Sequence, residues 1–227
     1  MRFKYLVFST LLLSLSLHAV ENYEAEYRFK SSEVNLKGIR KLNIDTEGNS
    51  SLTFKAKSAL ARLYFETNFY IQDNSVKTES YIIEVKPGFV NRDQEIYIDN
   101  NAKKMRSSGR DEWEVEMPEV NVLDPLNAQI QIRINVMQGK DKFSLDLLEI
   151  ENGSVEPNLY SITSENKECY IGDELYSCIE LTRIRDNGDR KTTYLMAKEL
   201  DYMFIEIKDV GPKRTNMLTL EKILSLG

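Results

Sequence analysis

Apolar and polar residues alternate along most of this chain, as expected for β-strands that have one buried face and one exposed face. The alternation runs through residues 22–117 and is interrupted by short clusters of Asp, Asn, Gly and Pro, including residues 45–49 and Pro87-Gly88. It resumes over residues 142–223, where the Asp-Asn-Gly-Asp cluster at 186–189 has the composition of a tight hairpin turn. Short strands separated by such turns predict an antiparallel meander.

One segment between the two runs predicts a helix over residues 124–138. Asp124 and Pro125 are a favoured N-cap and first helical residue, and Gly139 lies where a glycine would end the helix. Residues 128–136 are also apolar at every second position, which fits a strand, but the signals at the two ends favour the helix. The residues at helical spacing are Leu126, Ile130, Ile134 and Met137.

These elements predict a mainly β protein. We expect a single highly curved antiparallel sheet, or an open β-barrel, with one α-helix packed on the concave side. No linker, repeat or block of like charge divides the chain, so residues 20–227 are expected to form one domain.

Residues 1–19 differ in composition and resemble a secretory signal peptide. Arg2 and Lys4 precede a mostly apolar run over residues 5–17, and Ala19 is a small residue suited to cleavage. The run is shorter than the ~20 residues that span a bilayer, which disfavours the alternative of an uncleaved N-terminal anchor. We therefore expect a periplasmic protein with no transmembrane segment after signal removal.

Charge and histidine content exclude several functions. The chain has 30 Lys and Arg against 36 Asp and Glu, and removal of residues 1–19 would change the net charge from −6 to −8, so nucleic-acid binding is not expected. The one histidine, His18, would be lost with the signal peptide. Ser-His and Cys-His catalysis and histidine-ligated metals are then impossible. We expect no catalytic residue, metal or cofactor, although a hydrolase that uses two carboxylates stays an alternative.

The two cysteines, Cys169 and Cys178, flank a turn at residues 172–174. A hairpin there would bring their Cα atoms within disulfide range, roughly 4.4–6.8 Å, and a structural disulfide suits an exported protein. A redox-active pair and a metal pair are weaker alternatives, because the spacing is not Cys-x-x-Cys and no histidine completes a metal site.

Aromatic residues are concentrated in the first run of strands. On a curved sheet they would line an apolar groove for an acyl chain or another hydrophobic ligand. The alternative is that they pack against the helix and leave no groove. The candidate ligand-binding residues are Phe69, Tyr81 and Trp113 on the sheet and Leu126, Ile130, Ile134 and Met137 on the helix.

Three motifs carry a family likeness: YEAEYRF (23–29), LDPLNAQIQIR (123–133) and TYLMAKELDYMFIEI (193–207). Their order is that of landmarks in a family of exported bacterial proteins, the domain-of-unknown-function 3108 family, which the chain resembles over about residues 22–224. The resemblance implies a β-rich periplasmic domain and brings no established catalytic residues.

The function that fits these features is a non-enzymatic binding or carrier domain whose partner is an apolar small molecule or lipid. The alternative is an envelope structural or assembly factor that contacts an envelope protein, for example by adding a strand at a sheet edge.

Overall fold

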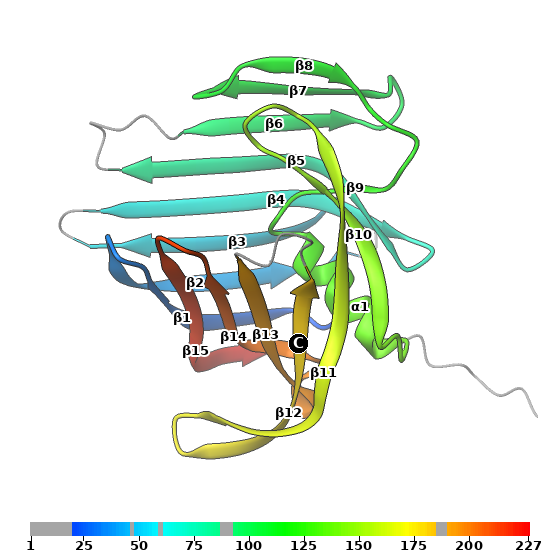
Figure 1. Ribbon diagram of the computed structural model, residues 1–227. Helices are drawn as coiled ribbons and strands as arrows, with labels where there is room; N and C mark the ends of the chain where they lie inside the picture. Colours follow the sequence, from blue (N-terminus) through cyan, green and yellow to red (C-terminus); the bar gives the residue numbers. More distant parts are fainter. Residues whose placement is uncertain (1–19, 46–47, 59–60, 87–92, 185–189) are drawn as a thin grey trace, which may run out of the picture.

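The computed structural model describes residues 20–227 except 46–47, 59–60, 87–92 and 185–189 (Figure 1). The expected signal peptide and the expected turns at Pro87-Gly88 and 186–189 lie outside the described residues. The strands are β1 (Tyr23–Lys30), β2 (Asn35–Asn43), β3 (Ser50–Lys57), β4 (Arg62–Gln72), β5 (Ser75–Lys86), β6 (Gln94–Asp99), β7 (Lys104–Gly109), β8 (Trp113–Glu116), β9 (Val122–Leu123), β10 (Lys142–Leu148), β11 (Val155–Ile171), β12 (Glu174–Ile184), β13 (Lys191–Ala197), β14 (Met203–Val210) and β15 (Thr215–Leu226).

These fifteen strands form one continuous sheet. Its order is β8-β7-β6-β5-β4-β3-β2-β1-β15-β14-β13-β12-β11-β10-β9, and every neighbouring pair is antiparallel except β9 and β10, which are parallel. The first and last strands of the chain, β1 and β15, pair in the middle of the sheet. The prediction of a single, highly curved, mainly antiparallel sheet is confirmed.

The sheet curls without closing into a barrel. In Figure 1, β10 and β11 cross in front of the β4–β6 region, while β8 stays at the far edge. The edge strand β9 contacts β5 through side chains: the Thr78 hydroxyl donates to the carbonyl of Val122 (2.8 Å), and the side-chain amide of Asn121 donates to the carbonyl of Val76 (3.0 Å). Side-chain hydrogen bonds therefore hold the β9 edge of the sheet against β5, a strand inside the other half of the sheet, where backbone pairing does not.

Helix α1 (Ala128–Met137) lies inside the curl (Figure 1). It begins four residues later than predicted, because Pro125, Leu126 and Asn127 form a turn ahead of it. Asp124 still accepts the N–H groups of Leu126 (2.7 Å) and Asn127 (2.9 Å), as an N-cap carboxylate does. The helix is buried on nearly all sides, which is why its apolar residues fit two periodicities at once.

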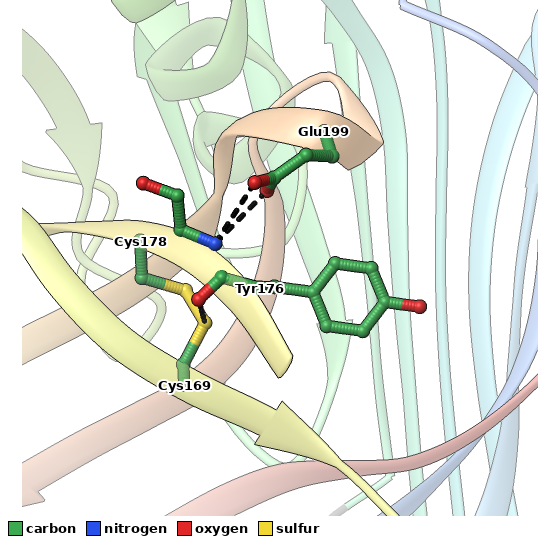
Figure 2. The surroundings of a disulfide bond; sticks show 5 residues. Cys169, Tyr176, Cys178 and Glu199 are labelled. Atoms are coloured by element: carbon green, nitrogen blue, oxygen red, sulfur yellow. Dashed lines mark hydrogen bonds between the residues drawn. A yellow bond between two sulfur atoms is a disulfide. The ribbon is translucent and has the colours of Figure 1, made fainter. Parts of the chain in front are cut away.

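The cysteine hairpin is formed by β11 and β12 and projects beyond the rest of the sheet (Figure 1). Its turn is Gly172-Asp173, with Gly172 at φ +60°. Cys169 and Cys178 form the predicted disulfide, with their Cα atoms 6.0 Å apart. Figure 2 shows that the backbone N–H of Ser177 donates to both carboxylate oxygens of Glu199 (3.0 and 3.1 Å), which lies in the short 3-10 helix η1 (Lys198–Leu200).

Candidate functional site

Most of the predicted ligand-binding residues come together on the concave face. Phe69 on β4 is paired with Thr78, and Tyr81 on β5 is paired with Thr67. Side chains of cross-strand partners point to the same face, and both threonines contact the start of the helix segment. Leu126, Ile130 and Ile134 are buried in this segment, and Met137 is half-buried at the end of the helix.

Trp113 lies elsewhere. Its indole N–H donates to the carbonyl of Ile150 (2.9 Å) in the loop between β10 and β11. Gly153 of the same loop has φ +75°, and a Cβ atom there would lie 2.8 Å from the indole ring. The tryptophan therefore holds this loop against β8, at a distance in the fold from the helix residues with which it was grouped.

Asp124 is the one acidic residue that is buried in the described part of the chain. One of its carboxylate oxygens accepts the two backbone N–H groups of its own turn, and the other accepts the Thr67 hydroxyl (2.6 Å). Burial raises the pKa of Asp124 from 3.8 to about 6, although the three hydrogen bonds act in the opposite direction. Asn127 extends the network by donating to Thr67 and Thr78.

The first turn of the helix is attached to the β4–β5 turn. The side-chain oxygen of Gln131 accepts the N–H of Val76 (2.8 Å), and its amide donates to the carbonyl of Asn74 (3.0 Å). Polar side chains thus connect the chain to the sheet just before the helix and again in its first turn. Hydrogen bonds of this kind position an element more specifically than apolar contact does.

Two arginines are the only buried cationic residues in the described ranges: Arg40 on β2 and Arg133 on α1. Arg40 donates through Nη2 to the side-chain oxygen of Gln129 (2.8 Å), and Arg133 donates through Nε to the carbonyl of Asp201 (3.0 Å). The Arg40 guanidinium lies 5.6 Å from the ring centre of Tyr27, and that of Arg133 lies 5.6 Å from the ring centre of Tyr23. Neither forms an ion pair within the described ranges.

A row of aromatic rings crosses the concave face of the second half of the sheet. The ring centres of Phe143 and Tyr160 are 5.5 Å apart, those of Tyr160 and Tyr194 are 6.0 Å apart, and those of Tyr194 and Phe204 are 5.7 Å apart. The row runs from β10 to β14, and Phe204 at its end lies 6.0 Å from the Arg40 guanidinium. It therefore forms a largely buried aromatic surface that ends at a buried charge.

A cleft of about 770 Å³ opens among residues of β10, β11 and β12 and the loop that follows β10. It reaches Pro125 at the start of the helix segment and contains both apolar and charged residues. The apolar lining residues are Pro125, Leu147, Leu148, Ile150, Pro157, Leu159 and Ile184.

Arg40 and Arg133 were missed as candidates by the sequence reasoning, although β2 carried a signal. Its buried positions are Leu36, Gly38, Arg40 and Leu42, so Arg40 occupies an inward position of a regular alternation. A cation at an inward position is unusual enough to mark a site. Arg133 carried no such signal, because it lies in a helix that is buried on several sides.

The chain is similar in structure to a β-barrel-like protein of the domain of unknown function DUF1849 from Brucella abortus. The two share 7% sequence identity with a TM-score of 0.57, over 90% of this chain and 98% of that chain. At this identity the likeness concerns the fold. No protein-family model and no curated protein matches the chain, and the resemblance to the 3108 family stays a prediction.

In the described ranges, no helix combines the length and the apolar character needed to cross a bilayer.

Proposed function

We propose that the protein is exported to the periplasm and acts there as a non-enzymatic binding or carrier domain for a hydrophobic ligand. The composition of residues 1–19 and the Cys169–Cys178 disulfide support export to an oxidising compartment. A curled sheet supports a binding role, because its concave face resembles the interior in which closed β-barrels hold a small ligand.

The cleft beside Pro125 is the observation that carries this proposal. Its volume of about 770 Å³ falls within the roughly 300–1,000 Å³ typical of ligand sites. Apolar residues from β10, β11 and β12 line it, and Pro125 brings it to the start of the helix segment. An apolar chain that entered the cleft would meet aliphatic side chains of these three strands.

A fluorescent apolar probe tests this site with two matched variants. Ile184 lines the cleft and is 43% exposed, whereas Val210 at the end of β14 is 39% exposed and lies outside the cleft lining. We expect Ile184→Asp to weaken probe binding at least tenfold, because a carboxylate in an apolar lining must lose hydration when the probe binds. Val210→Asp should bind the probe like the unaltered protein. Absence of probe binding by the unaltered protein, or equal loss in both variants, would overturn the proposal.

Native mass spectrometry of the protein purified from its own periplasm provides a second test. We expect an apolar small molecule or lipid to leave with the protein and to be absent from Ile184→Asp. A preparation that carries no such molecule, even when it is purified without detergent, contradicts the carrier role.

The projecting hairpin favours a second function, that of an envelope structural or assembly factor. Tyr170 and Leu175 face each other across the hairpin and are 57% and 56% exposed. The disulfide constrains this tip, and large apolar side chains on a constrained surface are typical of protein contact sites. Periplasmic crosslinking should recover one specific partner that is lost when both residues are replaced by Ser. Recovery of no specific partner counts against this function.

A further inference from the structure

We propose that Arg40 and Arg133 bind the carboxylate head group of the ligand, and that the ligand is therefore a fatty acid whose chain lies along the aromatic row. This inference rests on the proposed carrier function and names its ligand class. It is carried by a juxtaposition in the fold: two buried guanidinium groups lie at the end of a row of aromatic rings.

No anionic side chain in the described ranges pairs with either of the two arginines. Arg40 is 1% exposed and Arg133 is 2% exposed. Arginine keeps its proton in proteins, so two positive charges lie inside the fold, and each would be costly to bury without an anion. The third buried charge in the described part of the chain, Asp124, is bonded to its own turn and to Thr67 and forms no ion pair with either arginine.

Both guanidinium groups also have unused donors. Arg40 Nε and Arg133 Nη1 are buried and have no hydrogen-bond partner in the ranges that the structure describes. A buried donor without an acceptor costs roughly 1–3 kcal/mol, and such groups in a native protein call for a physical reason. A carboxylate accepts hydrogen bonds through two oxygens and matches guanidinium geometry. It would balance the charge and satisfy the donors together.

The helix places the two arginines on one side of the site. Gln129, which accepts from Arg40, is four residues before Arg133, so both contacts lie on the same side of α1. On the sheet, Arg40 is paired with Ala25, and the neighbouring inward positions on β1 are Tyr23 and Tyr27. These tyrosine rings lie against the guanidinium groups and hold them in place without neutralising them.

The aromatic row leads from this charge pair to β10, a strand that also supplies Leu147 and Leu148 to the cleft lining. Phe204, the last ring of the row, lies 6.0 Å from the Arg40 guanidinium, and Phe143, the first ring, lies on β10. An ionised head at the arginines and an aliphatic chain along the rings would match the polarity at each end. The unpartnered N–H groups are buried, so the head group reaches them when the Arg40–Gln129 and Arg133–Asp201 contacts separate.

The test compares ligands that differ in their head group alone. Binding of dodecanoate, 1-dodecanol, acetate and inorganic phosphate to the exported protein is measured by calorimetry. We expect dodecanoate to bind at least tenfold more tightly than dodecanol, because charge-assisted hydrogen bonds add to the chain contacts. Acetate and phosphate should bind far more weakly than dodecanoate, since they lack a chain.

Variants then assign the preference to the two arginines. Arg40→Met and Arg133→Met should each bind dodecanoate and dodecanol with nearly equal affinity, while dodecanol still binds as it does to the unaltered protein. Arg106→Met is the matched control, because Arg106 also lies over a tyrosine ring, 5.2 Å from the centre of Tyr97, but on the outer face. It should keep the full preference.

A measurement on the unaltered protein covers the case in which the buried variants do not fold. With dodecanoate labelled with ¹³C at the carboxyl carbon, the bound carboxylate should stay ionised to a lower pH than the same acid in water. A bound carboxyl that titrates at or above its value in water would overturn the inference. Equal binding of dodecanoate and dodecanol would also overturn it and would leave the carrier function standing, whereas failure of both to bind would overturn the carrier function itself. Acetate or phosphate binding as tightly as dodecanoate would show a free-anion site and refute the fatty-acid assignment.

Discussion

Replacement of Asp124 by Asn should remove a pH-dependent cost from the folded protein. Burial raises the pKa of this carboxyl from 3.8 to about 6, so the folded state resists its ionisation. Because the folded-state pKa lies above the unfolded value, the favourable contribution of the protonated acid is complete below about pH 3.8 and is lost as the pH rises through 6. The difference between the two pKa values corresponds to roughly 3 kcal/mol.

The Asn variant keeps the geometry of the site while removing the charge. Its amide oxygen can still accept the N–H groups of Leu126 and Asn127, and its amide nitrogen can donate to Thr67, whose hydroxyl then accepts. At pH 7.5 we therefore expect Asp124→Asn to be more stable than the unaltered protein by up to roughly 3 kcal/mol. The advantage should shrink toward pH 4.

Urea unfolding at pH 4, 5, 6 and 7.5, followed by circular dichroism and Trp113 fluorescence, measures this difference. Asp99→Asn is the matched control, because Asp99 also accepts two backbone N–H groups, those of Asn101 and Ala102, but is exposed. Ionisation of an exposed carboxylate carries no burial cost, so its variant should not gain stability with pH. A stability difference for Asp124→Asn that is constant from pH 4 to 7.5 would refute the reasoning.

Three further predictions concern other parts of the fold. Replacing Cys169 and Cys178 by Ser should lower the free energy of unfolding by roughly 2.5–3 kcal/mol, from the loss of a closed loop of about ten residues; a non-reducing denaturation series checks this, and an unchanged midpoint contradicts it. Gly38→Ala should cost about 1–3 kcal/mol, because the new Cβ would lie 2.6 Å from a backbone oxygen of β3, whereas Gly211→Ala meets ordinary contacts of 3.7 Å and should cost far less. Ion pairs with cations on β1 and β2 lower the pKa of Glu221 to about 2. The stabilisation of the folded state by this carboxylate is therefore present above pH 4.5 and is lost as the pH falls. Because the pairs are largely exposed, Glu221→Gln should lower the free energy of unfolding by less than about 1 kcal/mol, and by nothing measurable in 1 M salt.

The fold class followed from short-range patterns because a strand's buried face repeats every second residue. In β1 the side chains of Tyr23, Ala25 and Tyr27 are buried, and in β6 those of Gln94, Ile96 and Ile98 are buried, as the alternation predicts. The disulfide was predictable for a similar reason, since a two-residue turn places nearby cysteines on one face of a hairpin. These features depend on residues that are close in the sequence.

The predicted ligand-binding residues stay a prediction, and none of them lines the cleft beside Pro125. Phe69, Tyr81 and the apolar helix residues were expected at the sheet–helix contact, where the structure places them. Trp113 was grouped with them by its chemistry, but its contact is with the loop at Ile150, which no local pattern indicates. The buried cation Arg133 escaped notice because a polar residue in a helix usually faces water.

The amino-acid sequence by itself determined which faces of the strands are buried, that a helix separates two runs of strands, and that the cysteines can pair. The tertiary structure decided how the sheet curls, what covers the helix, and which polar groups become buried. The physical reason is distance along the chain: contacts such as Thr78 with Val122 and Arg133 with Asp201 join residues 44 and 68 positions apart. Periodicity shows which face of a strand or helix is buried. Which distant face it packs against depends on the shape of the whole fold.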